Sequence, residues 1–141
     1  MDVVSEVVYR ANVSVTGGRV GRATSDDGGL DVALARPGSP DGVNPEQLLA
    51  AGWGACFLST VHALGRKSGV DTSQAELTVS VTLGKNADQL FTLRAEFDVS
   101  IPSLPAAVVA DLVEQAHGRC PYSRALMGSI EVRTLIDGMA A

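Results

Sequence analysis

The chain has 141 residues, a formal net charge of −5 and only two cysteines. This length suits one domain, residues 1–141, with its own hydrophobic core. Hydrophobic residues make up 45% of the chain and charged residues 19%, which excludes a disordered protein, and an acidic chain without a Lys/Arg cluster is not expected to bind nucleic acid.

The first third of the chain is predicted to form an antiparallel meander of three strands. Apolar and polar residues alternate over residues 7–16, which predicts a strand with one buried face. Gly17 and Gly18 then predict a turn, and residues 19–25 a second, weaker strand. A further turn at residues 26–29 precedes the third strand at residues 30–35.

A long apolar helix is predicted next. Asn44 can cap it, Pro45 suits its first position, and Gln47 completes a capping-box-like spacing. The helix should run to about Ser68 and stop at Gly69. Residues 48–61 are apolar nearly all round, so this helix should be buried either inside the fold or between subunits.

The second half of the chain predicts two strands, a helix, a short helical turn and a last strand. These lie at residues 76–83, 91–101, 104–118, 123–127 and 130–134. Three strands, a helix, two strands, a helix and a strand make an α+β fold.

We expect the protein to be cytoplasmic. Residues 1–6 show no basic region followed by an apolar run, and the apolar run at residues 48–58 is too short to span a bilayer, so no membrane association is predicted. In a reducing compartment, two cysteines are better suited to a transient disulfide than to a permanent one.

Cys56 lies in the middle of the apolar helix, and Cys120 precedes Pro121 at the start of the short helical turn. A helix start lowers the pKa of a thiol, and a second thiol can close a disulfide after the first has been oxidised. The alternative is that both cysteines are small buried hydrophobes, which is the commoner fate and is favoured by cysteine count alone.

A reactive Cys56 needs a nearby cation, and an arginine would serve at any working pH. Arg19 is one candidate, although a solvated arginine at a strand start is the simpler interpretation, and Glu46 could orient it through a bidentate pair. Glu46 and Cys56 are ten residues apart, which is about 15 Å along a helix. One arginine reaching both therefore requires a broken helix or a site shared across a dimer.

Other side chains allow further interpretations. His62 and His117, with the two cysteines, are the minimum for a zinc site, but their spacing is wrong, so we expect no metal and no bound cofactor. His117 is better explained as a helix-terminal residue that interacts with the helix dipole. Trp53, Phe57 and Phe97 could line an apolar substrate pocket, although aromatic residues at such places are more often core.

Four segments together resemble the organic hydroperoxide resistance proteins of the OsmC/Ohr superfamily. They are Thr16-Gly17-Gly18-Arg19-Val20-Gly21, residues 25–32 with Ser-Asp-Asp-Gly-Gly-Leu-Asp-Val, the Asn-Pro-Glu-Gln segment that leads from Asn44 to Cys56-Phe57, and Cys120-Pro121-Tyr122-Ser123. The resemblance covers nearly the whole chain, in order and at suitable spacings.

The resemblance implies roles for four residues. Cys56 would be the peroxidatic cysteine, Cys120 the resolving cysteine, Arg19 the group that stabilises the thiolate, and Glu46 the carboxylate that holds Arg19. It also implies an intertwined homodimer with antiparallel sheets wrapped around two long central helices. The reductant would be the dihydrolipoyl group of a lipoylated partner protein.

The implied activity is a thiol-dependent peroxidase that reduces alkyl and fatty-acid hydroperoxides to alcohols. The alternative is a redox-sensing or small-ligand-binding dimer without turnover. The loop at residues 39–43, which is shorter and less rich in glycine than is usual in the family, keeps this alternative open, and Trp53-Gly54 stands where the family usually has Tyr-Ala.

Overall fold

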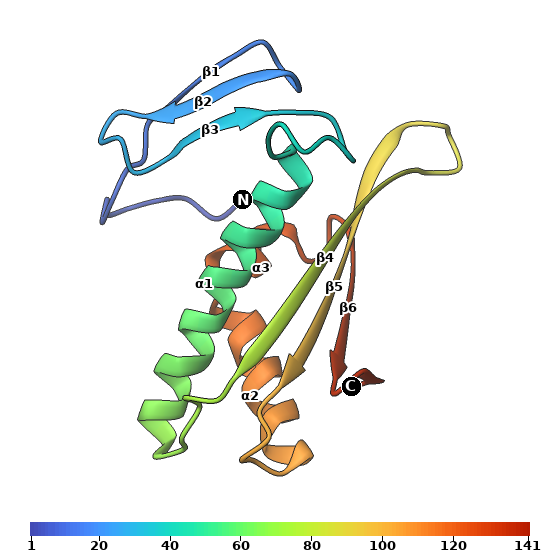
Figure 1. Ribbon diagram of the computed structural model, residues 1–141. Helices are drawn as coiled ribbons and strands as arrows, with labels where there is room; N and C mark the ends of the chain where they lie inside the picture. The colour runs from blue at the N-terminus through green and yellow to red at the C-terminus, as the bar shows by residue number, and fades with distance from the viewer. The chain divides into compact units, whose positions relative to one another are not determined.

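The computed structural model describes all 141 residues, which divide into two units, Met1–Pro45 and Glu46–Ala141. Their elements follow the predicted α+β order (Figure 1).

The first unit is a three-stranded antiparallel sheet. Its strands are β1 (Val13–Thr16), β2 (Gly21–Ser25) and β3 (Asp31–Leu34), in the order β1-β2-β3, as the sequence predicted. Gly17 and Gly18 have φ of 74° and 66°, a backbone conformation that glycine adopts without a steric penalty. Asp27 closes the second turn, where its Oδ1 accepts hydrogen bonds from Ser25 Oγ at 2.6 Å and the Gly29 amide at 2.8 Å.

Two sequence predictions for this unit were wrong. Residues 7–12 form no strand and their side chains are exposed, because β2 offers only enough residues to pair with Val13–Thr16. Arg19 does not start a strand. It lies in the turn between β1 and β2.

Helix α1 (Pro45–Ser68) begins and ends at the predicted residues. Gly69 has φ of 70°, and the Val70 amide donates to the Gly65 carbonyl at 2.8 Å, which satisfies a carbonyl of the last turn. The buried face of α1 carries Trp53, Phe57, Val61 and Leu64, at the spacing of one helical stripe.

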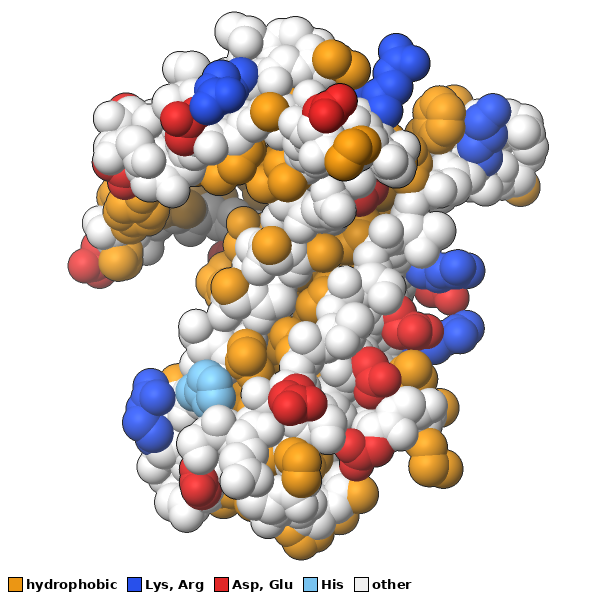
Figure 2. Space-filling model, viewed as in Figure 1, with side chains coloured by type: hydrophobic (Ala, Val, Ile, Leu, Met, Phe, Trp, Pro, Cys, Tyr) orange, Lys and Arg blue, Asp and Glu red, His pale blue; other side chains and the backbone are white.

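The opposite face of α1 is not covered within the second unit. Ala51 and Ala55 are exposed, and a groove of about 420 Å³ between α1 and β4 is lined by Gly54, Leu58 and Val79 among other residues. Figure 2 shows hydrophobic side chains along this helix. The apolar run at residues 48–58 is too short to span a bilayer. Helix α1 as a whole, with a mean hydropathy of 1.4 in its most apolar window, nevertheless has the length and composition of a membrane span. A central helix of a globular protein has the same properties.

The second sheet has the order β4-β5-β6-β7. Its strands are β4 (Glu76–Lys85), β5 (Phe91–Ser100), β6 (Glu131–Ile136) and β7 (Met139–Ala140). The β4–β5 and β6–β7 pairs are antiparallel, but β6 joins β5 in parallel. The reason is that α2 (Ala106–Arg119) and α3 (Pro121–Leu126) form a crossover that returns the chain to the same end of the sheet. Strand β7 has only two residues and leaves no periodic signal in the sequence.

The core of the second unit lies between the sheet and helices α1 and α2, which run along it in Figure 1. Strand β5 contributes Ala95, Phe97 and Val99, which alternate along the strand and are all fully buried. Helix α2 contributes Val109, Leu112, Val113 and Ala116, which are buried, and Val108, which is half-buried. This core fixes the positions of the helices that carry the two cysteines.

Candidate functional site

The two cysteine sulfurs lie next to each other. Cys120 Sγ donates to Cys56 Sγ at 3.5 Å, and both thiols are free. A disulfide has an S–S distance of about 2.05 Å, so a shift of about 1.5 Å would bring the sulfurs into bonding contact. The residues are 64 positions apart in the sequence, and the packing of α1 against α2 and α3 brings them together.

Cys120 occupies the junction between two helices. Its amide donates to the Ala116 carbonyl at 2.8 Å and so closes α2, while its carbonyl accepts from the Arg124 amide at 2.9 Å in the first turn of α3. Pro121 suits the first helical position because it has no amide hydrogen to leave unpaired. The predicted location of Cys120 at a helix start is confirmed, but its side chain is fully buried.

Cys56 is half-buried on α1. Burial raises the pKa of the Cys56 thiol most, the hydrogen bond between the two thiols raises the same pKa further, and repulsion between two negative sulfurs adds a smaller increase. The backbone amide of Tyr122 acts in the opposite direction by donating a hydrogen bond to the sulfur. Within the second unit alone, therefore, Cys56 favours the protonated form and needs a cation to react as a thiolate near neutral pH.

A chain of buried hydrogen bonds lies beside the cysteines. Trp53 Nε1 donates to Ser123 Oγ at 2.9 Å, and the same hydroxyl lies 2.9 Å from His117 Nδ1. His117 Nε2 lies 3.1 Å from Thr134 Oγ1. Burial lowers the pKa of His117 to about 4, so the imidazole is neutral at physiological pH. If the imidazole carries its proton on Nε2, Trp53 donates to Ser123, Ser123 donates to His117 Nδ1, and His117 Nε2 donates to Thr134.

His117 lies in the last turn of α2, as predicted, but its buried ring is neutral near pH 7, so it does not act as a charge at the helix dipole. It stacks within the core, with ring centroids 4.5 Å from Phe57 and 5.1 Å from Phe97. The local sequence could not reveal this, because the partners of the ring come from α1, β5, α3 and β6.

Trp53, Phe57 and Phe97 are fully buried. The ring centroid of Phe97 lies 4.9 Å from that of Trp53 and 5.1 Å from that of Phe57, in edge-to-face geometry. This arrangement fits the core interpretation of the three residues. Contact between them and a substrate stays a prediction, and it would require a rearrangement of this cluster.

Tyr122 lies over α1 next to the cysteines. A Cβ added to Gly52 would lie 3.0 Å from Tyr122 Oη, so the missing side chain of Gly52 makes room for the phenol. Gly52 and Cys56 are four residues apart and share one face of α1. Tyr122 is 41% exposed.

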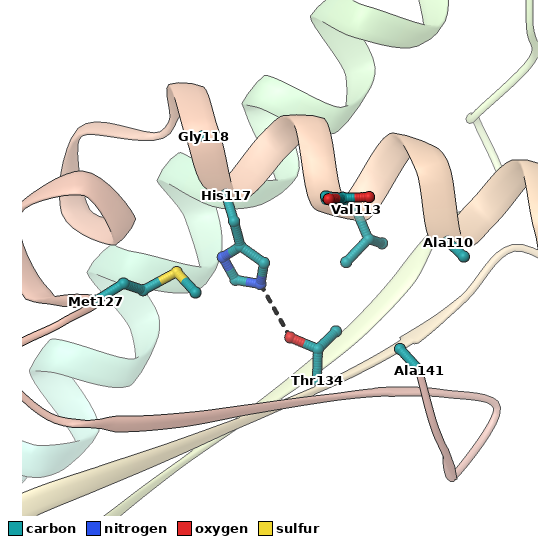
Figure 3. Close-up of a pocket in the computed structure, with 8 residues that line it drawn as sticks. Ala110, Val113, His117, Gly118, Met127, Thr134 and Ala141 are labelled. Carbon is teal, nitrogen blue, oxygen red and sulfur yellow. Dashed lines mark hydrogen bonds between the residues drawn. The ribbon is translucent and has the colours of Figure 1, made fainter.

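A separate cavity of about 510 Å³ lies between α2, the segment after α3 and the end of the chain. Figure 3 shows the imidazole of His117 and the hydroxyl of Thr134 meeting inside it, with Met127 beside the ring. Its remaining lining residues are mainly small or apolar: Ala110, Val113, Gly118 and Ala141, with Glu114 as the only carboxylate. Neither cysteine lines this cavity.

The histidines and cysteines do not come together as a group of metal ligands. His62 Nδ1 lies 2.7 Å from Thr72 Oγ1, whereas His117 bonds to Ser123 and Thr134. No cluster of three or more His, Cys, Asp or Glu residues is found in the chain.

Comparisons with known proteins agree on one family. Residues 38–134 match the family model of OsmC-like proteins. The organic hydroperoxide resistance protein OhrA of Bacillus subtilis is 39% identical over 136 residues, which is 92% of this chain and 96% of that protein. A protein of the same description from Xanthomonas axonopodis is 37% identical over 133 residues, with 90% and 93% of the two chains covered.

Solved structures point the same way. The crystal structure of OhrB from Bacillus subtilis has a TM-score of 0.86 at 33% identity, covering 92% of this chain and 99% of that one. An organic hydroperoxide resistance protein from Elizabethkingia anophelis, with thiocyanate bound, has a TM-score of 0.82 at 34% identity, covering 93% and 97%.

This chain belongs to the organic hydroperoxide resistance branch of the OsmC-like family.

Within this Ohr protein, the four residues with implied roles fall into the two units. Cys56, Cys120 and Glu46 belong to the second unit and Arg19 to the first. Glu46 is half-buried in the first turn of α1, and Arg19 is in the turn after β1. The structure thus brings the two cysteines together, and the pairing of Arg19 with Glu46 and with Cys56 stays a prediction.

Sequence reasoning missed Ser123 and Thr134, and it placed His117 correctly at the end of a helix but did not predict its hydrogen bonds. A weak signal did exist. His117 precedes Cys120 by three residues and Ser123 follows it by three, so both lie one helical turn from the thiol. Only their hydrogen bonds reveal that they form one group.

Proposed function

We propose that this Ohr protein is a thiol-dependent peroxidase that reduces organic hydroperoxides to alcohols. The observation that carries the proposal is the 3.5 Å separation of two free sulfurs, one half-buried and one fully buried. The names of its relatives, organic hydroperoxide resistance proteins, supply the substrate class.

The reaction balances with two thiols. The Cys56 thiolate attacks the outer peroxide oxygen, the O–O bond breaks, and the alkoxide leaves as an alcohol after taking up a proton. The Cys120 sulfur then attacks the resulting sulfenic acid, the S–S bond forms, and water leaves. A dithiol reduces the disulfide by thiol–disulfide exchange, and we assign this role to a dihydrolipoyl group on a partner protein.

Activation of Cys56 is assigned to Arg19, held by Glu46. A guanidinium lowers the pKa of a nearby thiol, which offsets the increase caused by burial and by Cys120. A homodimer would supply the surface that α1 lacks in the single chain, and the exposed Val7, Tyr9, Val13 and Val15 of the first unit also favour a second copy. We expect the dimer to work in the cytoplasm, where its thiols stay reduced.

The intact mass after one equivalent of an organic hydroperoxide tests the proposal. The wild type should lose two hydrogens and both alkylatable thiols. Cys120→Ser should stop at an oxidised Cys56, whereas Cys56→Ser should remain unchanged. An unchanged wild-type mass would refute the peroxidase assignment.

Turnover separates the enzyme from a sensor. With excess dihydrolipoamide, a peroxidase consumes many equivalents of hydroperoxide, while a redox sensor stops after one. Arg19→Ala should slow the first step and leave the unfolding free energy unchanged. Light scattering measures the mass in solution, and a monomer would contradict the dimer.

A further inference from the structure

We propose that Trp53, Ser123 and His117 are positioning residues that hold Cys120 against Cys56 for disulfide closure. The inference rests on the proposed function, because it assigns residues to the second chemical step of that reaction. It concerns the step in which the Cys120 sulfur displaces a leaving group from the Cys56 sulfur.

The three side chains come from the elements whose relative position sets the distance between the sulfurs. Trp53 lies one turn before Cys56 on α1, His117 lies one turn before Cys120 on α2, and Ser123 lies one turn after Cys120 on α3. The hydroxyl of Ser123 joins the other two, with 2.9 Å to Trp53 Nε1 and 2.9 Å to His117 Nδ1. These bonds therefore tie the helix of one cysteine to both helices that meet at the other.

The environment makes these bonds stronger constraints than a surface contact would be. Trp53 and Ser123 are fully buried, and His117 is 9% exposed. In a core, a polar group that loses its partner stays unpaired, because water does not replace the partner. No buried side-chain nitrogen or oxygen in the chain lacks a partner, so the arrangement is complete as it stands.

Closure needs the two sulfurs to move together by about 1.5 Å and to meet in the geometry of a disulfide, so it depends on how the two residues are held. A misplacement of about 1 Å in a reacting pair can slow a reaction by about 100-fold. Freeing the first turn of α3 from α1 should therefore slow closure. It should affect the first attack on Cys56 much less, because Cys120 does not react in that step and, like the Tyr122 amide, acts on it only through the pKa of Cys56.

Ser123→Ala and Thr134→Val form a matched pair of variants. Each variant removes one hydroxyl, leaves a side chain of similar shape, and loses one of the two hydrogen bonds made by the His117 imidazole. Only Ser123→Ala cuts the link to Trp53 and α1. The unfolding free energy of both variants, measured with urea, shows whether they are folded and comparably stable.

A small uncharged aromatic disulfide, dithiodipyridine, measures closure without any peroxide. Cys56 attacks one of its sulfurs and releases the first thiopyridone. Cys120 then attacks the Cys56 sulfur of the mixed disulfide and releases the second thiopyridone, so two protein thiols are oxidised and one reagent disulfide is reduced. The second release does not depend on reagent concentration, and its rate is the rate of closure.

We expect Ser123→Ala to slow the second release by about tenfold or more and Thr134→Val by less than about twofold. The rate of the first release, corrected for the pKa of Cys56 in each variant, should change by less than about twofold in both. The fluorescence of Trp53, the only tryptophan, should change on closure in the wild type, since its Nε1 is bonded to α3.

A second pair of variants tests His117. Asparagine places an amide near the position of Nδ1 and can keep the bond to Ser123, whereas glutamine reaches the position of Nε2 and keeps only the bond to Thr134. Both lose the same ring contacts. His117→Asn should retain most of the closure rate, and His117→Gln should behave like Ser123→Ala.

Equal closure rates in Ser123→Ala and Thr134→Val would overturn the inference, and so would release of only one thiopyridone by the wild type. If the wild type consumes no hydroperoxide but the variants still differ in closure, the positioning role stands and the peroxidase assignment fails. If the wild type consumes hydroperoxide and the variants close at equal rates, the peroxidase assignment stands and the positioning role fails.

Discussion

Phe97→Leu distinguishes a core role from a substrate-pocket role for the aromatic cluster. Phe97 is fully buried on β5 and touches three rings, with centroid distances of 4.9 Å to Trp53, 5.1 Å to Phe57 and 5.1 Å to His117. Leucine is smaller and fills most of the volume, but it loses all three ring contacts. The structure therefore predicts a loss of stability and no change in substrate preference.

The magnitude follows from those contacts. An edge-to-face pair contributes about 0.5–1.5 kcal/mol beyond the area it buries, and hydrophobic swaps of similar volume usually cost less than about 1.5 kcal/mol. Three lost pairs, partly compensated by leucine, should lower the free energy of unfolding by about 2 kcal/mol. For a chain of this length, that corresponds to a decrease in Tm of about 6–8 °C.

Urea denaturation followed by far-ultraviolet circular dichroism measures the loss. Phe91→Leu is the control, because Phe91 lies on the same strand, is 72% exposed, and should cost at most about 1 kcal/mol through its contact with Lys85. The rates of oxidation by a short-chain and a long-chain hydroperoxide should keep the same ratio in wild type and variant. The core assignment is refuted if stability changes by less than about 0.5 kcal/mol while that ratio shifts.

Three further outcomes are expected. Between pH 6.5 and pH 4 the unfolded chain binds a proton at His117 while the folded chain does not. The free energy of unfolding should therefore have its full value above this range and fall by about 3 kcal/mol by pH 4. Urea titrations should show that His117→Asn loses this pH dependence. The pH dependence of the alkylation rate reports the pKa of Cys56. In Arg19→Ala this pKa should lie above the ordinary value of a thiol, because burial and Cys120 still raise it, and in the wild type it should be lower. Identical pH–rate profiles in the two proteins would show that Arg19 does not act on Cys56. Gly65→Ala should lower the free energy of unfolding by more than about 1 kcal/mol, despite the better helix propensity of alanine. The reason is that its Cβ would lie 2.5 Å from Thr72 Cγ2 and 3.0 Å from the Val70 carbonyl oxygen. Gly54→Ala, whose Cβ would lie 3.1 Å from Val79 Cγ2, should cost less in the same denaturation assay.

Local signals were sufficient for several elements. Helix α1 begins at Pro45 and ends before Gly69 as predicted, because a helix start and a positive-φ glycine act within one turn of the chain. The strand predicted at residues 91–101 matches β5 (Phe91–Ser100), in which the alternate residues Ala95, Phe97 and Val99 are buried. Pro121 was enough to place Cys120 at a helix start.

Residues 7–12 mark the limit of such signals. Their alternation is that of a strand, but a strand also needs a partner of matching length, and β2 pairs only as far as Val13. The parallel pairing of β6 with β5 was likewise not readable from the residues of β6, since pairing direction depends on where the α2–α3 crossover returns the chain.

The sequence by itself identified Cys56 and Cys120 as candidate reactive residues and determined the limits of α1, because caps, glycines and periodicity are short-range properties. Only the tertiary structure decided that the Cys56 and Cys120 sulfurs meet and that Trp53 bonds to Ser123, across 64 and 70 residues respectively. Contacts of this kind arise when separate apolar faces pack into one core, and no local pattern specifies which polar atoms then meet inside it.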